Sequence, residues 1–250
     1  MTIEVIVLAA GHGTRMASSR PKVLHTLGGR SLLDHVLNTA QALDPSQIHV
    51  VVGPENESLA EAQTRGALIW HIQEERLGTG HAVELAMCAV HEPATVLVLY
   101  ADMPLVRVDT LRALCERAQN NRVVMLTACL DAVDGLGRII RDNTGAVTGI
   151  VEEADATAKQ RAIREVNMGI LVAPAKRLGQ WLPEIGNDNQ QGERYLTDVV
   201  AMAVADGVDV VAHAVADPDE SLGVNDKAQL AAAERALQRR QAHQLMQAGL

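Results

Sequence analysis

Apolar and polar positions follow two different periods along the first half of the chain. Continuous apolar runs, typical of buried strands, lie at residues 3–10, 48–52, 67–72 and 95–100. Between and after these runs, apolar side chains recur every three or four positions. This spacing predicts helices at residues 31–43, 56–65, 79–90 and 108–119, with Ser31 and Thr79 as candidate N-caps. Strands that alternate with helices favour a parallel sheet covered on both faces.

The second half of the chain has shorter apolar runs that are interrupted by Gly, Asp and Asn. We expect strands at residues 123–130, 138–141, 146–152 and 166–172, and an edge strand at 208–213. Helices are expected at residues 195–205 and 226–246. The close spacing of the strands indicates hairpins. The predicted fold class is therefore α/β, with a mixed, mostly parallel sheet that has a small antiparallel portion.

Composition limits the classes of protein that remain. The chain has 250 residues, which favours one large domain, and its net charge of −9 with no basic face argues against nucleic-acid binding. Three cysteines without a C-x-x-C pair are typical of reduced thiols in the cytoplasm. No signal peptide is evident, and no apolar run approaches the roughly 18 residues that span a bilayer. We therefore expect a cytoplasmic protein without a membrane partner.

The first predicted strand opens into a Gly-rich turn, in the segments VIVLAAGHGTRM and RPKVLH. Backbone N–H groups around Gly11 and Gly13 can converge on an anion, and Arg15 and Lys22 add the cations that suit a nucleoside triphosphate. Met16 stands where a Walker loop or a dinucleotide fingerprint would need Gly, so neither motif is present. The turn predicts an enzyme that handles nucleotide phosphates; an ordinary Gly-rich turn is the alternative.

Two further motifs follow predicted strands, where ligands of open α/β sheets bind. Asp102, in YADMPL, suits Mg²⁺, although a turn before Pro104 also favours Asp. In QEERLGTGHA, the amide of Gln73 can satisfy both the N3–H and a carbonyl of uracil. Gly78 and Thr79 of the same motif fit either close approach of a ligand or a plain loop with a helix cap.

Polar residues also lie at strand edges in the second half. Gly137, Glu152 and Asn167 come from GLGRI, GIVEEADA and EVNMGI, and a carboxylate with a carboxamide suits sugar hydroxyls and an acetamido group. Thr197, in YLTD, and Asn225, in GVND, have two interpretations. Each fits a helix cap, and Asn225 also fits a second oxygen ligand for a cation.

Together and in this order, these motifs resemble the uridyltransferase domain of the bacterial N-acetylglucosamine-1-phosphate uridyltransferases, the GlmU family, within the sugar-phosphate nucleotidyltransferase superfamily. The resemblance covers essentially the whole chain. It implies a Rossmann-like, GT-A-like nucleotidyltransferase fold. It also implies an Mg²⁺-dependent reaction of UTP with N-acetylglucosamine 1-phosphate, which gives pyrophosphate and the cell-wall precursor UDP-N-acetylglucosamine.

The resemblance also implies a role for individual residues. By this resemblance, the nucleotide-binding residues of the chain would be Leu8, Ala9, Ala10, Gly11, Gly13, Lys22, Gln73, Gly78 and Thr79. The sugar-binding residues would be Thr79, Tyr100, Gly137, Glu152, Asn167 and Thr197. Arg15, Lys22 and Asp102 would be catalytic, and Asp102 and Asn225 would hold Mg²⁺. The chain departs from the family at Ala101, commonly Gly, and at Arg76, often Gln, to which we assign no role.

The expected domain organisation is a uridyltransferase domain at residues 1–225 and a helix at 226–250. In the family this helix leads to a left-handed β-helix that acetylates glucosamine 1-phosphate and supplies most trimer contacts. The present sequence has no hexapeptide repeats, so we expect no acetyltransferase activity and a weaker oligomer or none. Two alternatives stay open: a related nucleotidyltransferase that uses CTP with a polyol phosphate or GTP with a molybdopterin, and a catalytically silent nucleotide-binding module.

Overall fold

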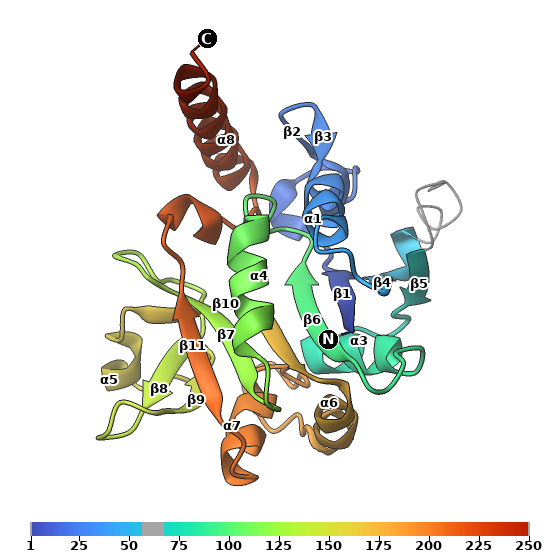
Figure 1. Cartoon of the computed structure of the whole chain (residues 1–250), viewed down its shortest axis with the longest axis vertical. Helices are drawn as coiled ribbons and strands as arrows, with labels where there is room; N and C mark the ends of the chain where they lie inside the picture. The colour runs from blue at the N-terminus through green and yellow to red at the C-terminus, as the bar shows by residue number, and fades with distance from the viewer. Residues whose placement is uncertain (1, 57–67, 250) are drawn as a thin grey trace.

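A nine-stranded mixed sheet forms the centre of the molecule (Figure 1). The computed structural model describes residues 2–56 and 68–249, to which all structural statements refer. The strand order is β11-β7-β10-β6-β1-β4-β5, and β8 pairs with β10 and β9 beside this path. The strands are β1 (Ile3–Ala9), β4 (Gln47–Val52), β5 (Leu68–Ile72), β6 (Thr95–Tyr100), β7 (Val123–Cys129), β8 (Arg138–Arg141), β9 (Val147–Val151), β10 (Glu165–Pro174) and β11 (Val210–Ala214). A separate hairpin joins β2 (Thr26–Leu27) to β3 (Arg30–Ser31).

The α-helices of the described residues are α1 (Leu32–Gln41), α3 (Thr79–Met87), α4 (Val108–Arg117), α5 (Ala158–Arg161), α6 (Ala175–Trp181), α7 (Asp198–Ala205) and α8 (Lys227–Gln247). All lie close to predicted positions except α5 and α6, which were not predicted. The predicted helix at residues 56–65 falls almost entirely outside the described residues. Ser31 caps α1 by accepting a hydrogen bond from the Asp34 N–H at 3.0 Å. The prediction of Thr79 as an N-cap is wrong, because Gly78 holds that position and the Thr79 hydroxyl accepts from the Leu196 N–H instead.

The predicted division of the sheet into two parts is confirmed. The four strands of the first half, β5, β4, β1 and β6, are mutually parallel. Strand β10 runs antiparallel to both β6 and β7, and β8 and β9 form an antiparallel pair. Strand β11 pairs with β7 in parallel at the edge of the sheet. The first residues of β10 therefore lie at the same edge as the carboxyl end of β6.

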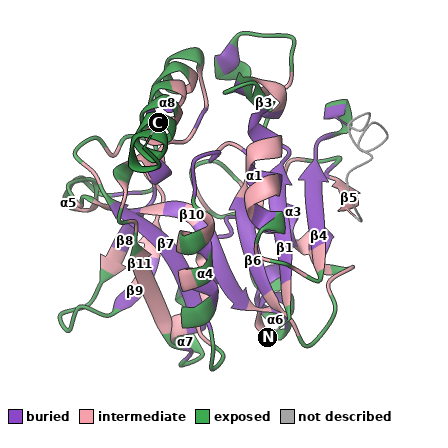
Figure 2. Cartoon of the chain, turned by 45° about the horizontal axis from the view of Figure 1, so that its top comes forward, coloured by how far each residue is buried: buried purple, intermediate pink, exposed green. Residues whose placement is uncertain are grey.

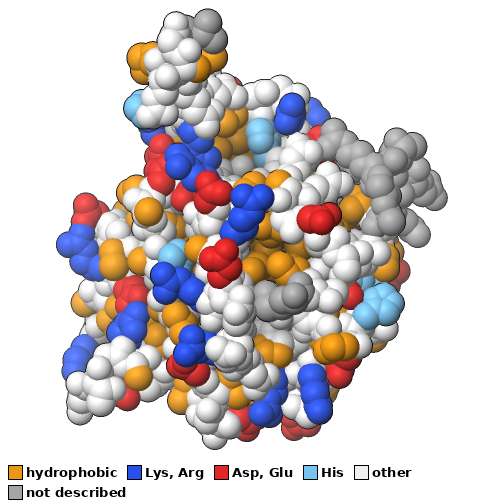
Figure 3. Space-filling model, in the orientation of Figure 1, with side chains coloured by type: hydrophobic (Ala, Val, Ile, Leu, Met, Phe, Trp, Pro, Cys, Tyr) orange, Lys and Arg blue, Asp and Glu red, His pale blue; other side chains and the backbone are white. Residues whose placement is uncertain are grey.

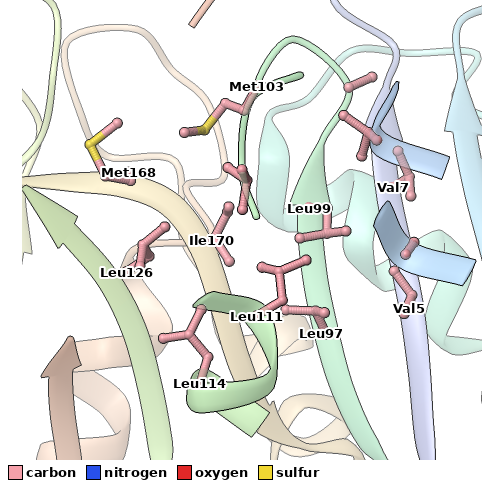
Figure 4. Packing of buried hydrophobic residues seen from close by; sticks show 14 of the residues in the cluster. Val5, Val7, Leu97, Leu99, Met103, Leu111, Leu114, Leu126, Met168 and Ile170 are labelled. Atoms are coloured by element: carbon pink, nitrogen blue, oxygen red, sulfur yellow. The ribbon is translucent and has the colours of Figure 1, made fainter. Parts of the chain in front are cut away.

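Helices cover both faces of the sheet; its central strands β1, β4, β6 and β7 are largely buried, whereas the edge strands β5 and β11 are only partly buried (Figure 2). On one face, α1 and α4 pack on apolar side chains of β1, β6, β7 and β10, including Val7, Leu99 and Ile170, and α4 contributes Leu114 (Figure 4). On the other face, α3, α6 and α7 bury a second cluster around Val83, Trp181 and Val200. Because the core contains no Phe, branched aliphatic side chains supply most of the buried apolar surface.

The long helix α8 buries apolar side chains only in its first half. Ala233 and Ala236 are buried with Leu27, Leu105 and other apolar residues, and Asp226 caps the helix. The C-terminal half projects away from the sheet, where Leu245 and Met246 are exposed (Figure 1). Charged side chains gather where α8 meets the η5 segment (Pro218–Ser221), with the ion pair Arg239–Asp219 at 3.1 Å (Figure 3). None of the described helices is long and apolar enough to cross a membrane.

Candidate active site

The strand order itself creates a crevice at one edge of the sheet. After β1 the chain continues to β4 and β5 on one side and then returns to β6 on the other side of β1. At the carboxyl ends of β1 and β6, the following loops run in opposite directions and leave a gap between them. Open α/β sheets bind ligands in such a gap. Two cavities, of about 330 and 290 Å³, open at this edge and share Thr79, Tyr100, Asp102 and Glu193.

The larger, nucleotide-side cavity contains most residues that were expected to hold the nucleotide. It is lined by Leu8, Ala9, Ala10, Gly11, Lys22, Gln73, Gly78 and Thr79. Gly13 and Arg15 do not line it. A Cβ at Gly13 would lie 2.5 Å from the Cβ of Lys22, so Gly at this position lets Lys22 approach the turn. Arg15 is exposed in the short 3₁₀ helix Thr14–Met16, and its catalytic role stays a prediction.

Lys22 joins three segments that are far apart in the sequence. Its ammonium donates to Asp102 Oδ2 at 2.6 Å and to Asn225 Oδ1 at 2.9 Å. The side chains of Lys22 and Asp102 are only 10% and 20% exposed, so solvent screens this ion pair less than a surface pair. The Lys22 ammonium therefore contacts both side-chain oxygens, of Asp102 and Asn225, that were expected to bind a metal ion.

The smaller, sugar-side cavity brings together all six residues that were expected to bind the sugar. Thr79, Tyr100, Gly137, Glu152, Asn167 and Thr197 line it, together with Asp102 and Asn225. Asn167 reaches this cavity because β10 runs antiparallel to β6. Thr197 donates its hydroxyl to Glu152 Oε1 at 2.9 Å and makes no side-chain capping bond to α7. Its side chain thus orients the carboxylate.

Burial shifts the pKa values of titratable groups in this cavity, among them Glu152 and Tyr100. Burial raises the pKa of Glu152, and the nearby negative charges of Asp198 and Asp155 add to the rise, while the Thr197 hydrogen bond opposes it. Burial also raises the pKa of Tyr100, whose phenol is protonated at neutral pH. Both groups can therefore serve as hydrogen-bonding groups for a polar, hydroxyl-rich ligand.

The donor set beside Lys22 fits a hard divalent cation. Asp102 supplies a carboxylate oxygen and Asn225 an amide oxygen, which are the ligand types that Mg²⁺ takes together with phosphates and water. Within residues 2–56 and 68–249, no cluster of three or more His, Cys, Asp or Glu side chains could hold a metal by itself. A cation held by Asp102 and Asn225 would complete its coordination with phosphate oxygens or water.

Comparison with known proteins agrees with this geometry. The family described as "MobA-like NTP transferase domain" matches residues 5–167. The chain belongs to this family of NTP transferases. The resemblance to GlmU is also confirmed: this NTP transferase is 54% identical over 248 residues to "Bifunctional protein GlmU" of Alkalilimnicola ehrlichii, covering 99% of the chain and 53% of the relative. It is 48% identical over 250 residues to the protein of the same name from Stutzerimonas stutzeri, covering 100% of the chain and 55% of the relative. The chain thus spans about half the length of the curated relatives it matches.

Two solved structures show the same Rossmann-like fold. A nucleotidyl transferase from Methanothermobacter thermautotroptrophicus matches with a TM-score of 0.68 and 20% identity, covering 96% of this chain and 99% of that one. A UDP-glucose pyrophosphorylase complexed with UDP-glucose matches with a TM-score of 0.77 and 16% identity, covering 96% and 100%. The expected fold of this NTP transferase is therefore confirmed.

Arg76 and Gly169 are among the lining residues that had no expected role. Arg76 lines the nucleotide-side cavity, where its Nε donates to the Ala10 carbonyl at 2.7 Å and its guanidinium pairs with Glu55. Only its departure from the family pattern marked it in the sequence. Gly169 lines the sugar-side cavity where the register of β10 shifts between Asn167 and Leu171. A Gly inside a strand pattern is a signal for such an irregularity.

Proposed function

We propose that this NTP transferase carries out Mg²⁺-dependent transfer of UMP from UTP to N-acetylglucosamine 1-phosphate, giving UDP-N-acetylglucosamine and pyrophosphate. The observation that carries the proposal is the Lys22 ammonium, held by Asp102 and Asn225 where the nucleotide-side and sugar-side cavities adjoin. A cation at the boundary of two ligand cavities suits a reaction in which two phosphate groups must approach each other.

The proposed chemistry needs no general base. A phosphate oxygen of the sugar phosphate attacks the α-phosphorus of UTP, and the bond to the bridging oxygen breaks so that pyrophosphate leaves. The attacking oxygen already carries charge at neutral pH, because the second phosphate pKa is about 6. Lys22 and Arg15 then offset the charge that develops on the α-phosphate and pyrophosphate. Asp102 and Asn225 would hold Mg²⁺, which supplies further charge neutralisation.

Local hydrogen bonds support the assignment of the two ligand ends. Gln73 is 3% exposed, and its amide nitrogen donates to the Gly78 carbonyl at 3.1 Å, which orients the amide in the nucleotide-side cavity. Asn167 Oδ1 accepts from the Gly169 N–H at 3.1 Å, which orients the amide in the sugar-side cavity. Oriented amides suit a uracil edge at one end and an acetamido group at the other.

The test is a pyrophosphate-release assay with N-acetylglucosamine 1-phosphate, Mg²⁺ and each of UTP, CTP and GTP. We expect release with UTP and little with CTP or GTP. Lys22→Ala and Asp102→Ala should each lower turnover by about 10²-fold or more. Lys176→Ala, at an exposed position in α6, is the matched control and should retain activity. Preference for CTP or GTP would indicate another transferase, and UTP binding without release would indicate a silent module; either result refutes the proposal.

A further inference from the structure

One wall of the sugar-side cavity is a short loop that precedes β8. Gly135, Leu136 and Gly137 form this loop, and all three line the sugar-side cavity. None of the three lines the nucleotide-side cavity. A change in the position of this loop should therefore alter the sugar site without altering the nucleotide site.

A buried arginine holds the loop from behind. Arg138, the first residue of β8, has a side chain that is 2% exposed and lines neither cavity. Its guanidinium donates to the Leu136 carbonyl and to Glu153 Oε2, the latter at 3.3 Å. Removing a guanidinium from water is costly unless hydrogen bonds and an opposite charge compensate for it. The burial of Arg138 thus ties it to the loop and to Glu153.

Glu153 holds the same loop at a second point. Its Oε2 atom also accepts a hydrogen bond from the Gly135 backbone N–H. That bond lowers the pKa of Glu153, and Arg138 lowers it further despite a contribution from burial that raises it, so the carboxyl stays ionised. The pair therefore fixes both a backbone N–H and a carbonyl of one three-residue segment.

The loop is joined in turn to residues at the proposed sugar contacts. The Gly137 carbonyl accepts from the Asn167 N–H at 2.8 Å. Glu152, which precedes Glu153 in the chain, presents its carboxylate to the same cavity. Arg138 and Glu153 thus lie directly behind Asn167, Glu152 and Gly137 without touching the cavity.

We propose that the Arg138–Glu153 pair acts as a positioning pair for the sugar phosphate: it sets the affinity for N-acetylglucosamine 1-phosphate and leaves the affinity for UTP unchanged. This inference rests on the proposed function. Neither residue is expected to touch a substrate, so the pair acts through the loop and through Asn167.

The first experiment is steady-state kinetics of pyrophosphate release on the full chain, with each substrate varied at saturating concentrations of the other. Arg138→Met should raise the KM for N-acetylglucosamine 1-phosphate by about tenfold or more, as for loss of a charge-assisted hydrogen bond. The KM for UTP should change by less than about twofold. The matched control is Arg141→Met on the same strand, which breaks the Arg141–Glu165 ion pair at 2.7 Å and should change neither KM.

The double variant Arg138→Met/Glu153→Leu keeps the test valid if the single variant folds poorly, because it leaves neither charge unpaired. It should show the same raised KM for the sugar phosphate as Arg138→Met, since the two residues act as a unit. An unchanged KM for the sugar phosphate in the double variant, or equal rises in both KM values, would overturn the inference.

A binding measurement separates this inference from the proposed function. Calorimetric titrations of UDP-N-acetylglucosamine and of UTP into wild type and double variant need no turnover. Weaker binding of the sugar nucleotide alone would support the positioning pair even if the wild-type chain released no pyrophosphate, a result that would refute only the proposed function. If wild type and double variant bound the sugar nucleotide with equal affinity, or if neither bound it, the proposed positioning role of Arg138 and Glu153 would be overturned.

Discussion

Gly78 is the position where a single methyl group should do the most measurable damage to the nucleotide-side cavity. Its φ of 110° and ψ of 177° fall in a region that side chains of L-residues rarely adopt. A Cβ there would lie 2.5 Å from the backbone oxygen of Arg194 and 2.7 Å from its nitrogen. Backbone atoms cannot rotate away as a flexible side chain can, so Gly78→Ala must push the two segments apart.

The size of the effect follows from the bonds that join these segments. The Gly80 N–H donates to the Arg194 carbonyl at 2.8 Å, and the Arg194 N–H donates to the Leu77 carbonyl at 2.7 Å. Strain of about 1–3 kcal/mol and loss of two hydrogen bonds at about 1 kcal/mol each are offset by about 0.4–1 kcal/mol from the stiffer unfolded chain. We expect the free energy of unfolding to fall by about 2–5 kcal/mol, and the KM for UTP to rise.

Urea unfolding followed by circular dichroism measures this change, with thermal unfolding as a second readout. The midpoint temperature should fall by about 2–4 °C for each kcal/mol. The matched control is Gly179→Ala in α6, where an added Cβ meets nothing within 4 Å. This control should stabilise the protein by about 0.5–1 kcal/mol, because Ala favours a helix over Gly. A Gly78→Ala variant as stable as the wild type would refute the reasoning.

Three further predictions concern pH, a helix cap and the cation site. Burial raises the pKa of Glu4 but hydrogen bonds with two histidines lower it more, and burial lowers the pKa of His71. In urea titrations, stability should therefore fall as pH drops below 6.5 and again below 4.5. Glu4→Gln should make the second fall smaller without abolishing it, because the pKa values of Glu55, Glu153 and Glu165 are also lowered. Asp226→Ala removes a side-chain cap with a 2.7 Å hydrogen bond to α8 and should cost about 1 kcal/mol in thermal unfolding, whereas Asp226→Asn should cost little. Lys22→Met frees Asp102 from its ammonium partner and should tighten Mn²⁺ binding without nucleotide by about tenfold in electron paramagnetic resonance titrations; an unchanged dissociation constant would contradict this view of the site.

Local sequence patterns were sufficient to predict most elements and the position of each motif relative to them. The apolar run at residues 3–10 forms β1, and the Gly-rich turn after it faces the larger cavity. Asp102 follows β6 as predicted. These features are local, because side-chain period and turn chemistry act within a few residues of one another. The mixed sheet was also predicted, since short strands separated by turn residues indicate hairpins.

The tertiary structure alone decided which of these residues meet. The ammonium of Lys22 reaches Asp102 and Asn225 across 80 and 203 positions of the chain. The Thr79 hydroxyl accepts a hydrogen bond from the Leu196 N–H and does not cap its own helix. No local sequence pattern predicted that Arg138 would be buried and paired with Glu153. Such contacts depend on strand order and on the antiparallel direction of β10, which are set by how all the apolar faces pack together. The sequence by itself determined the elements and the chemical groups at their ends, and the fold determined that the phosphate turn, the cation ligands and the sugar-side residues share one crevice.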